Sequence, residues 1–171
     1  PVTREVTEID IAVNAVTKGK YSHFMEKEIY EQPNAVANTI DGKLGDDDVL
    51  DNIFGLGSSE IFSNVKRIQF VACGTSLHAG KVGRFWFEKI AKIPCYVDFA
   101  SEYRYREPLV EEGTLFVTIS QSGETADTLA ALRYAQSKDY LSTLSICNVP
   151  TSSLARESEH VLFTNAGPEI G

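Results

Sequence analysis

Hydroxyl and amide side chains are concentrated in one short stretch of the chain, Ser120-Gln121-Ser122-Gly123-Glu124-Thr125. The stretch follows the apolar run 115–119, which predicts a buried strand, and precedes the helical pattern of residues 126–136. The first amides of a helix lack intrahelical partners and carry partial positive charge, so an anion binds well there. Gly123 lets the backbone approach a ligand closely. We therefore predict a phosphate site at this turn.

The alternative is that the turn is only a helix cap, with Ser122 or Thr125 accepting hydrogen bonds from backbone amides. Three hydroxyls, a glutamine and a glycine within six residues are more than a cap requires, which favours phosphate binding. Glu124 opposes this interpretation, because its carboxylate would repel a phosphate. We expect the Glu124 side chain to point out of the turn.

A second small turn, Cys73-Gly74-Thr75-Ser76, follows the predicted strand 68–73 and precedes a predicted helix at 77–92. The carboxyl ends of parallel strands share one edge of a sheet, so the two turns should face one crevice. Neither turn matches the phosphate-binding motifs of nucleotide-binding proteins, which favours a sugar phosphate over a nucleotide. Cys73 has no His or Lys beside it in sequence to activate it, so we favour a structural role over a nucleophilic one.

The elements that must position these turns alternate along the chain. Strands are predicted at 68–73, 95–99, 115–120, 141–147 and 160–164, with helices between them. This order predicts an α/β fold with three layers, a five-stranded parallel sheet with helices on both faces, preceded by N-terminal helices. The helix at 77–92 should bury a stripe formed by Val82, Trp86, Ile90 and Ile93, with Gly80 and Gly83 allowing close packing.

The first third of the chain lacks the alternation of strands and helices that begins at Val65. Residues 21–44 predict a helix with Met25, Ile29, Val36, Ile40 and Leu44 on one face, either kinked or divided at Pro33. Asp46-Asp47-Asp48 suggests the cap of a following helix more than a metal site. Tyr103-Arg104-Tyr105-Arg106 fits a subunit interface or a surface helix equally well. We expect a linker remnant at 1–20, an N-terminal helical segment at 21–64 and the main α/β unit, truncated at its C-terminal end, at 65–171.

The composition argues against several classes of protein and of binding partner. A chain of 171 residues with 43% apolar residues holds about one domain, and a net charge of −8 argues against nucleic acid and anionic membranes. We find no long apolar run and no leader, and the three cysteines, none in a C-x-x-C pair, suggest reduced thiols in the cytoplasm. We expect no metal and no cofactor. The ends at Pro1 and Gly171 suggest a part of a longer protein.

The motifs resemble those of a known family. Residues 72–76 and 120–128 resemble sugar isomerase (SIS) domains, which have a flavodoxin-like fold. More narrowly, residues 24–33, 100–106 and 165–171 are similar to the isomerase part of the glutamine–fructose-6-phosphate aminotransferases, or glucosamine-6-phosphate synthases. The resemblance extends from about residue 20 to the end of the chain.

This resemblance implies a role in amino-sugar biosynthesis, in which fructose 6-phosphate and glutamine-derived ammonia give glucosamine 6-phosphate. It implies that the sugar phosphate is held by Ser76, Ser120, Gln121, Ser122 and Thr125. It also implies that Cys73, Gly74 and Thr75 line the sugar site. The family's glutaminase domain and second SIS subdomain, with its catalytic His, Lys and Glu, would lie outside this chain, so we expect no catalytic residue here and an inactive fragment. A homodimer is expected. A non-catalytic sugar-phosphate sensor and another phosphosugar isomerase remain as alternatives.

Overall fold

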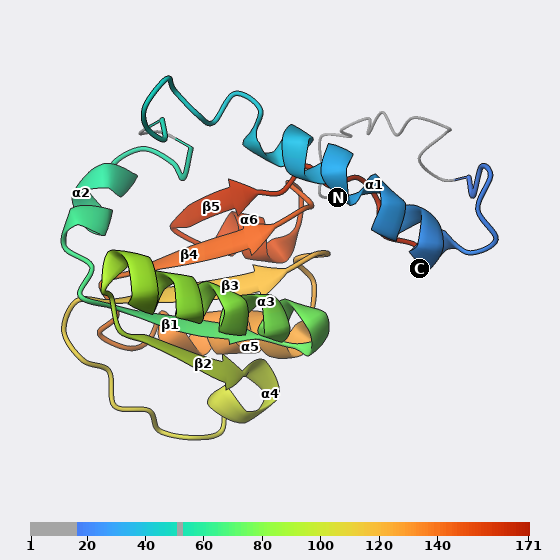
Figure 1. Ribbon diagram of the computed structural model, residues 1–171. Helices are drawn as coiled ribbons and strands as arrows, with labels where there is room; N and C mark the ends of the chain where they lie inside the picture. Colours follow the sequence, from blue (N-terminus) through green and yellow to red (C-terminus); the bar gives the residue numbers. More distant parts are fainter. Residues whose placement is uncertain (1–16, 51–52) are drawn as a thin grey trace, which may run out of the picture.

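The computed structural model describes residues 17–50 and 53–171, so most of the expected linker at 1–20 lies outside the described residues. Within the described part, five strands form one parallel sheet in the order β2-β1-β3-β4-β5 (Figure 1). The strands are β1 (Arg67–Ala72), β2 (Cys95–Phe99), β3 (Thr114–Ser120), β4 (Ser142–Cys147) and β5 (His160–Phe163). The predicted strands are confirmed, with bounds that differ by a residue at some ends.

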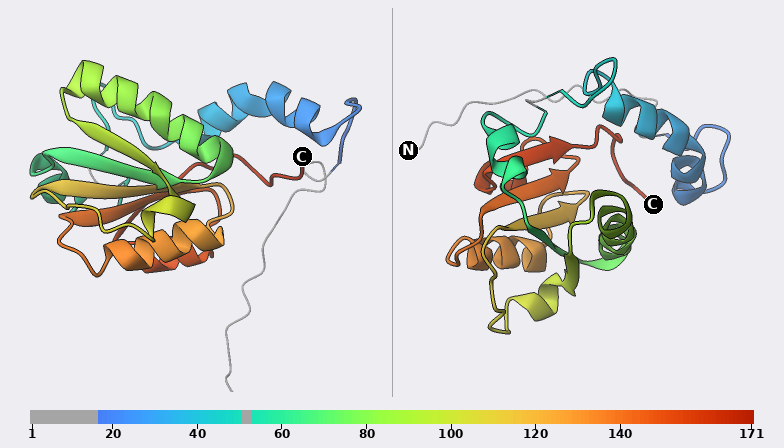
Figure 2. Two further views of the ribbon diagram at one scale, coloured as in Figure 1. Left: turned by 90° about the horizontal axis from the view of Figure 1, so that it is seen from below. Right: turned by 60° about the vertical axis from the view of Figure 1, so that its left-hand side comes forward.

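Helices cover both faces of the sheet, which confirms the predicted three-layer architecture. They are α1 (Phe24–Ile40), α2 (Ser58–Ser63), α3 (Gly74–Trp86), its π-helical continuation η2 (Phe87–Ala91), α4 (Ala100–Tyr103), α5 (Ala126–Ala135) and α6 (Ser153–Glu157). Figure 2 shows α3 on one face of the sheet and α5 with α6 on the other. Because every strand runs in the same direction, the loops that follow the strands gather at one edge.

Alternating side chains of the central strands divide the core between the two faces. Phe116 of β3 packs on the α5 side with Tyr103, Leu132 and Leu154. Val117, the next residue, belongs to the cluster on the opposite face, with other buried side chains from the sheet: Ile68, Phe70, Cys95, Leu115 and Leu144. Buried side chains therefore cover both faces of β1 and β3, the strands that lead into the two predicted turns.

The buried face of α3 differs from the prediction. Three of the four side chains expected in its buried stripe are at least half exposed, namely Val82, Trp86 and Ile90. The helix instead buries Leu77 and Gly80. A Cβ at Gly80 would lie 3.5 Å from Phe70, so the glycine does allow close packing on the sheet. Helical periodicity correctly identified an apolar face of this helix, but it wrongly predicted that this face is buried.

The segment before the sheet also departs from expectation. Helix α1 passes through Pro33 without division but ends at Ile40, so Leu44 lies outside it, and all five predicted apolar residues are exposed. The Asp46–Asp48 run caps no helix, because Gly45 N–H donates to Asp48 O (2.7 Å) in a turn closed by a bridge between Leu44 and Val49. In the described part of the chain the next helix begins at Ser58, so the cap prediction was wrong. No helix in the described part is both long and apolar enough to cross a membrane.

Tyr103 belongs to the core, which neither interpretation of residues 103–106 anticipated. Its side chain is fully buried, and its hydroxyl lies 2.5 Å from that of Tyr140. Burial and this hydrogen bond raise the Tyr103 pKa above its usual range. Arg106, by contrast, extends to form an ion pair with Asp98 at the end of β2. The pair of tyrosines fixes the start of the long loop that leads into β3.

Candidate functional site

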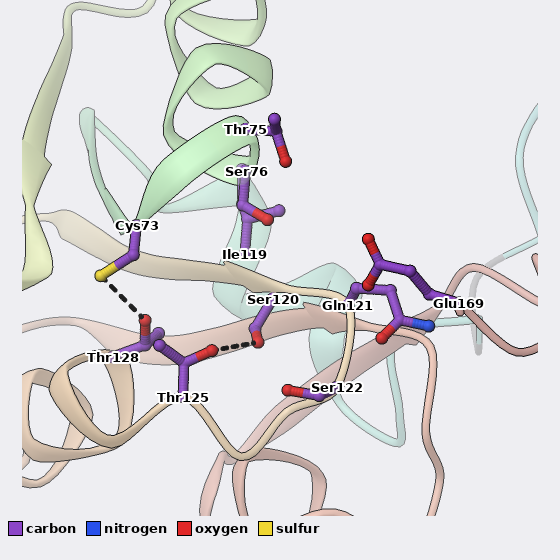
Figure 3. Close-up of a pocket in the computed structure, with 10 residues that line it drawn as sticks. All are labelled: Cys73, Thr75, Ser76, Ile119, Ser120, Gln121, Ser122, Thr125, Thr128 and Glu169. Carbon is purple, nitrogen blue, oxygen red and sulfur yellow. Dashed lines mark hydrogen bonds between the residues drawn. The ribbon is translucent and has the colours of Figure 1, made fainter. Parts of the chain in front are cut away.

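The two predicted turns meet at the carboxyl edge of the sheet and enclose a cavity of about 140 Å³ (Figure 3). Seven of the eight predicted site residues line it: Cys73, Thr75, Ser76, Ser120, Gln121, Ser122 and Thr125. The eighth, Gly74, is the first residue of α3, with φ +54°. The topology thus brings together residues that lie about fifty positions apart in the sequence.

The turn between β3 and α5 is held by its own hydroxyl groups. The Ser120 hydroxyl accepts a hydrogen bond from Gly123 N–H (3.1 Å), and the Ser122 hydroxyl accepts one from Glu124 N–H (3.2 Å). The hydroxyls of Ser120 and Thr125 are 3.2 Å apart. Thr125 is the N-cap residue of α5, yet its side chain caps no amide. The start of α5 therefore faces the cavity without a side-chain cap, as an anion site requires.

Gly123 occupies a place that no larger residue fits. Its φ is +66°, in the left-handed region, and an added Cβ would lie 2.5 Å from the Cβ of Ser152 and overlap its hydroxyl. The Gly123 carbonyl accepts a hydrogen bond from Leu154 N–H (3.1 Å). The turn is therefore packed directly against the start of α6. This backing fixes the positions of the cavity hydroxyls.

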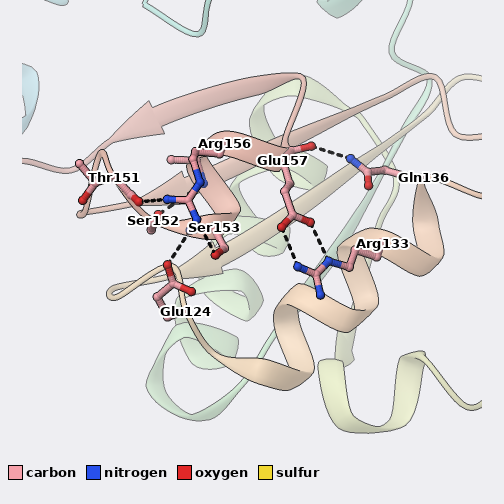
Figure 4. A network of polar contacts seen from close by, with 9 residues as sticks. Glu124, Arg133, Gln136, Thr151, Ser152, Ser153, Arg156 and Glu157 are labelled. Carbon is pink, nitrogen blue, oxygen red and sulfur yellow. Dashed lines mark hydrogen bonds and ion pairs between the residues drawn. The ribbon is translucent and has the colours of Figure 1, made fainter. Parts of the chain in front are cut away.

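Glu124 points away from the cavity, as predicted. Its Oε1 accepts a hydrogen bond from Ser153 N–H (2.7 Å) at the start of α6 (Figure 4). Hydrogen bonds from the backbone and side chain of Ser153 hold the pKa of this carboxyl below its ordinary value. The Glu124 charge is thus used to join the turn to α6, and it does not oppose an anion in the cavity.

The first turn contributes the opposite wall. Cys73 is the N-cap residue of α3, and its side chain caps no amide. Its Sγ accepts a weak hydrogen bond from the Thr128 hydroxyl (3.9 Å). Within the described residues no basic side chain is hydrogen-bonded to this thiol. This environment agrees with a Cys73 that lines the cavity and has no activating partner.

Sequence reasoning missed two residues at this edge, Glu169 and Asn148. Glu169 lines the cavity. Asn148 follows β4, and its backbone N–H donates to Gln121 O (3.1 Å) while its side chain binds Ala166 N (2.6 Å) and Gly167 O (2.6 Å). Asn148 follows a parallel strand as the two recognised turns do, so the same edge argument, extended to β4, would have found it.

A larger apolar cavity of about 320 Å³ lies against the face of the sheet on which Val117 packs. All the residues that line it are hydrophobic, among them Phe54, Phe62, Leu115 and Leu162. A phosphate or a sugar would lose its hydrogen bonds to water there without replacement. The smaller cavity at the carboxyl edge is therefore the candidate site.

Comparison with known proteins gives one consistent family. A model of the SIS domain matches residues 61–171. Glutamine–fructose-6-phosphate aminotransferase (isomerizing) of Pseudomonas syringae pv. tomato is 56% identical over 171 residues, which are all of this chain and 28% of that protein. The same enzyme of Pseudomonas aeruginosa is 55% identical over 170 residues, which are 99% of this chain and 28% of that protein.

A solved structure agrees with these matches. The C-terminal domain of glucosamine-fructose-6-phosphate aminotransferase from Francisella tularensis has a TM-score of 0.87 and 52% identity to this chain, covering 91% of this chain and 44% of that one. The chain spans 28% of the length of the curated relatives named above.

Proposed function

The chain belongs to the SIS domain family, and from this premise we propose that it is the sugar-phosphate-binding part of a glutamine–fructose-6-phosphate aminotransferase. The whole enzyme would convert fructose 6-phosphate and glutamine-derived ammonia into glucosamine 6-phosphate. The observation that carries the proposal is the cavity at the carboxyl edge, where hydroxyl donors converge with the uncapped start of α5. The similarity over the full chain to aminotransferases of this name supports it.

In this proposal the phosphate lies at the turn between β3 and α5. The hydroxyls of Ser120, Ser122 and Thr125 and the first amides of α5 donate to its oxygens. Ser76 and Gln121 complete the phosphate shell, and the remaining sugar-site residues are Cys73, Gly74 and Thr75. The site needs no basic side chain, because hydrogen-bond donors and the helix dipole supply the positive potential.

The chain alone would bind and not catalyse. Moving a proton between adjacent sugar carbons requires a general base held at those carbons. We propose that the catalytic His, Lys and Glu come from a second SIS subdomain outside these 171 residues, and that a glutaminase domain supplies the ammonia. Within this chain, residues 1–20 would be a linker, 21–64 an N-terminal helical segment and 65–171 the first SIS subdomain. We place the enzyme in the cytoplasm.

A homodimer is part of the same proposal. The outer side of α3 and η2 exposes large apolar side chains, namely Val82, Phe85, Trp86 and Ile90. Contiguous exposed apolar surface of this kind marks an interaction site in soluble proteins. Sedimentation of the full-length protein would test the dimer directly.

The function is tested in the full-length protein with Thr125→Ala. Loss of a hydrogen bond to a charged ligand costs about 1.5–3 kcal/mol, so KM for fructose 6-phosphate should rise roughly tenfold to a hundredfold. Thr151→Ala is the matched control, because Thr151 is exposed and does not line the cavity. The 171-residue chain should form no glucosamine 6-phosphate from fructose 6-phosphate and ammonia. An unchanged KM in Thr125→Ala would contradict the assigned phosphate site. Formation of glucosamine 6-phosphate by the 171-residue chain alone would contradict the proposal that the catalytic residues lie outside it.

A further inference from the structure

Glu169 is the one charged residue among those described that line the cavity. Figure 3 shows its carboxylate on the side of the cavity away from Thr125, a cavity that Gln121 also lines. The rest of the lining offers hydroxyls, an amide, a thiol and an isoleucine side chain. The cavity therefore has a donor-rich end at the turn before α5 and an anionic end at Glu169.

Hydrogen bonds on both sides hold Glu169 at this place. It lies in the return segment, which we define as residues 164–171, the chain that follows β5. On one side of Glu169, the Asn148 side chain binds Ala166 N and Gly167 O, both at 2.6 Å. On the other side, the Glu28 carboxylate of α1 accepts from Ile170 N (2.8 Å) and Gly171 N (3.1 Å). The position of Glu169 is thus tied to both β4 and α1.

The same anchor links Glu169 to the phosphate turn. Asn148 N–H donates to Gln121 O (3.1 Å), so one residue holds both the return segment and the turn between β3 and α5. The separation between the donor-rich end and the carboxylate is therefore built into the fold. A ligand that fills the cavity must match both ends.

An ionised carboxylate only accepts hydrogen bonds, and it repels a phosphate. It binds well to groups that donate, such as sugar hydroxyls. We propose that Glu169 accepts hydrogen bonds from the hydroxyl end of the sugar and repels a second phosphate, so that the site selects sugar monophosphates over bisphosphates. This inference rests on the proposed function, because it assumes a phosphate at the Ser120–Thr125 turn.

The test is titration calorimetry of this chain with three probes: inorganic phosphate, fructose 6-phosphate and fructose 1,6-bisphosphate. In the unmodified chain fructose 6-phosphate should bind at least about tenfold more tightly than either of the others. Glu169→Gln should reduce the ratio of the affinity for fructose 6-phosphate to that for inorganic phosphate about threefold or more. The same substitution should strengthen binding of fructose 1,6-bisphosphate about tenfold. Glu60→Gln, on α2 before β1 at the opposite edge, removes the same charge and should leave all three affinities unchanged. Circular dichroism and thermal melting verify that each variant is folded.

The outcomes separate the inference from the proposed function. If Glu169→Gln alters all three affinities by one factor, or alters none, the role of Glu169 is refuted while the phosphate site stands. If the unmodified chain binds none of the three probes, the proposed binding function of this chain fails and the role of Glu169 fails with it. If Glu60→Gln matches Glu169→Gln, the effect is general electrostatics and the inference is wrong.

Discussion

Gly123 and Ser152 lie in direct contact at the back of the cavity, so close that a Cβ on Gly123 would stand 2.5 Å from the Ser152 Cβ. The contact joins the turn after β3 to the start of α6, and the Leu154 N–H bond to Gly123 O (3.1 Å) reinforces it. The cavity hydroxyls on this turn are therefore positioned by a helix that contributes none of the lining.

This contact predicts a large effect for Gly123→Ala. The left-handed backbone costs an alanine about 1–2 kcal/mol, and overlap with Ser152 adds about 1–3 kcal/mol of overpacking. We expect the free energy of unfolding in urea to fall by about 2–5 kcal/mol, with loss of ligand binding. Gly42→Ala is the control, since Gly42 has the same φ of +66° but no atom within 4 Å of its added Cβ. Equal destabilisation of the two variants would show that Ser152 does not confine the turn.

Glu124 predicts a pH dependence of stability. Its folded-state pKa is lowered, chiefly by the Ser153 amide, so it stabilises the fold above its ordinary value of 4.5, and this contribution is lost as pH falls through the lowered value. Thermal melting should therefore show Glu124→Gln less stable than the unmodified chain at pH 7, with the difference in Tm shrinking as the pH falls below 4.5. Glu60→Gln controls for the lost charge. A difference in Tm that persists unchanged in acid would refute the assigned cause.

The cysteines predict selective thiol chemistry. Burial raises the pKa of Cys95 to about 11 and also raises that of Cys147, whereas Cys73 is half-buried and lines the cavity. A disulfide reagent at pH 8 should modify Cys73 first, since thiolates react and buried thiols do not. Saturating fructose 6-phosphate should slow this reaction, and Cys73→Ser should abolish the fast phase. If three thiols react in the fast phase, or if fructose 6-phosphate does not change its rate, the position of Cys73 in the ligand cavity is contradicted.

The sequence predicted the sheet well because buried parallel strands are short apolar runs punctuated by turns, as Phe116 and Val117 of β3 illustrate. It also located both cavity turns, since strand ends in such a sheet share one edge. The prediction failed where it had to say which surface an apolar helix face packs against. Trp86 and Ile90 repeat at helical spacing yet are exposed at 58% and 75%. Periodicity defines a face, and only the tertiary arrangement shows what covers it.

Glu169 was missed for a different physical reason. Glu169 reaches the cavity because Asn148 and Glu28, far away in sequence, hold the return segment in place. No local pattern encodes those hydrogen bonds. Tyr103 shows the same limit, since its neighbours Arg104 and Tyr105 suggested a surface while its own ring fills the core against Phe116. Local sequence predicts elements, and long-range contacts decide which of their residues meet.

The most direct test of the central claim, that the turn between β3 and α5 is a phosphate site, is calorimetric titration of this chain with fructose 6-phosphate and with fructose. A Thr125→Val variant, which keeps the side-chain shape but removes the hydroxyl, is measured beside it. We predict binding of the phosphate ester and none of fructose, with Thr125→Val weakening the ester about tenfold or more. Equal binding of the two sugars, or an affinity for the ester that Thr125→Val leaves unchanged, would contradict a phosphate site at this turn.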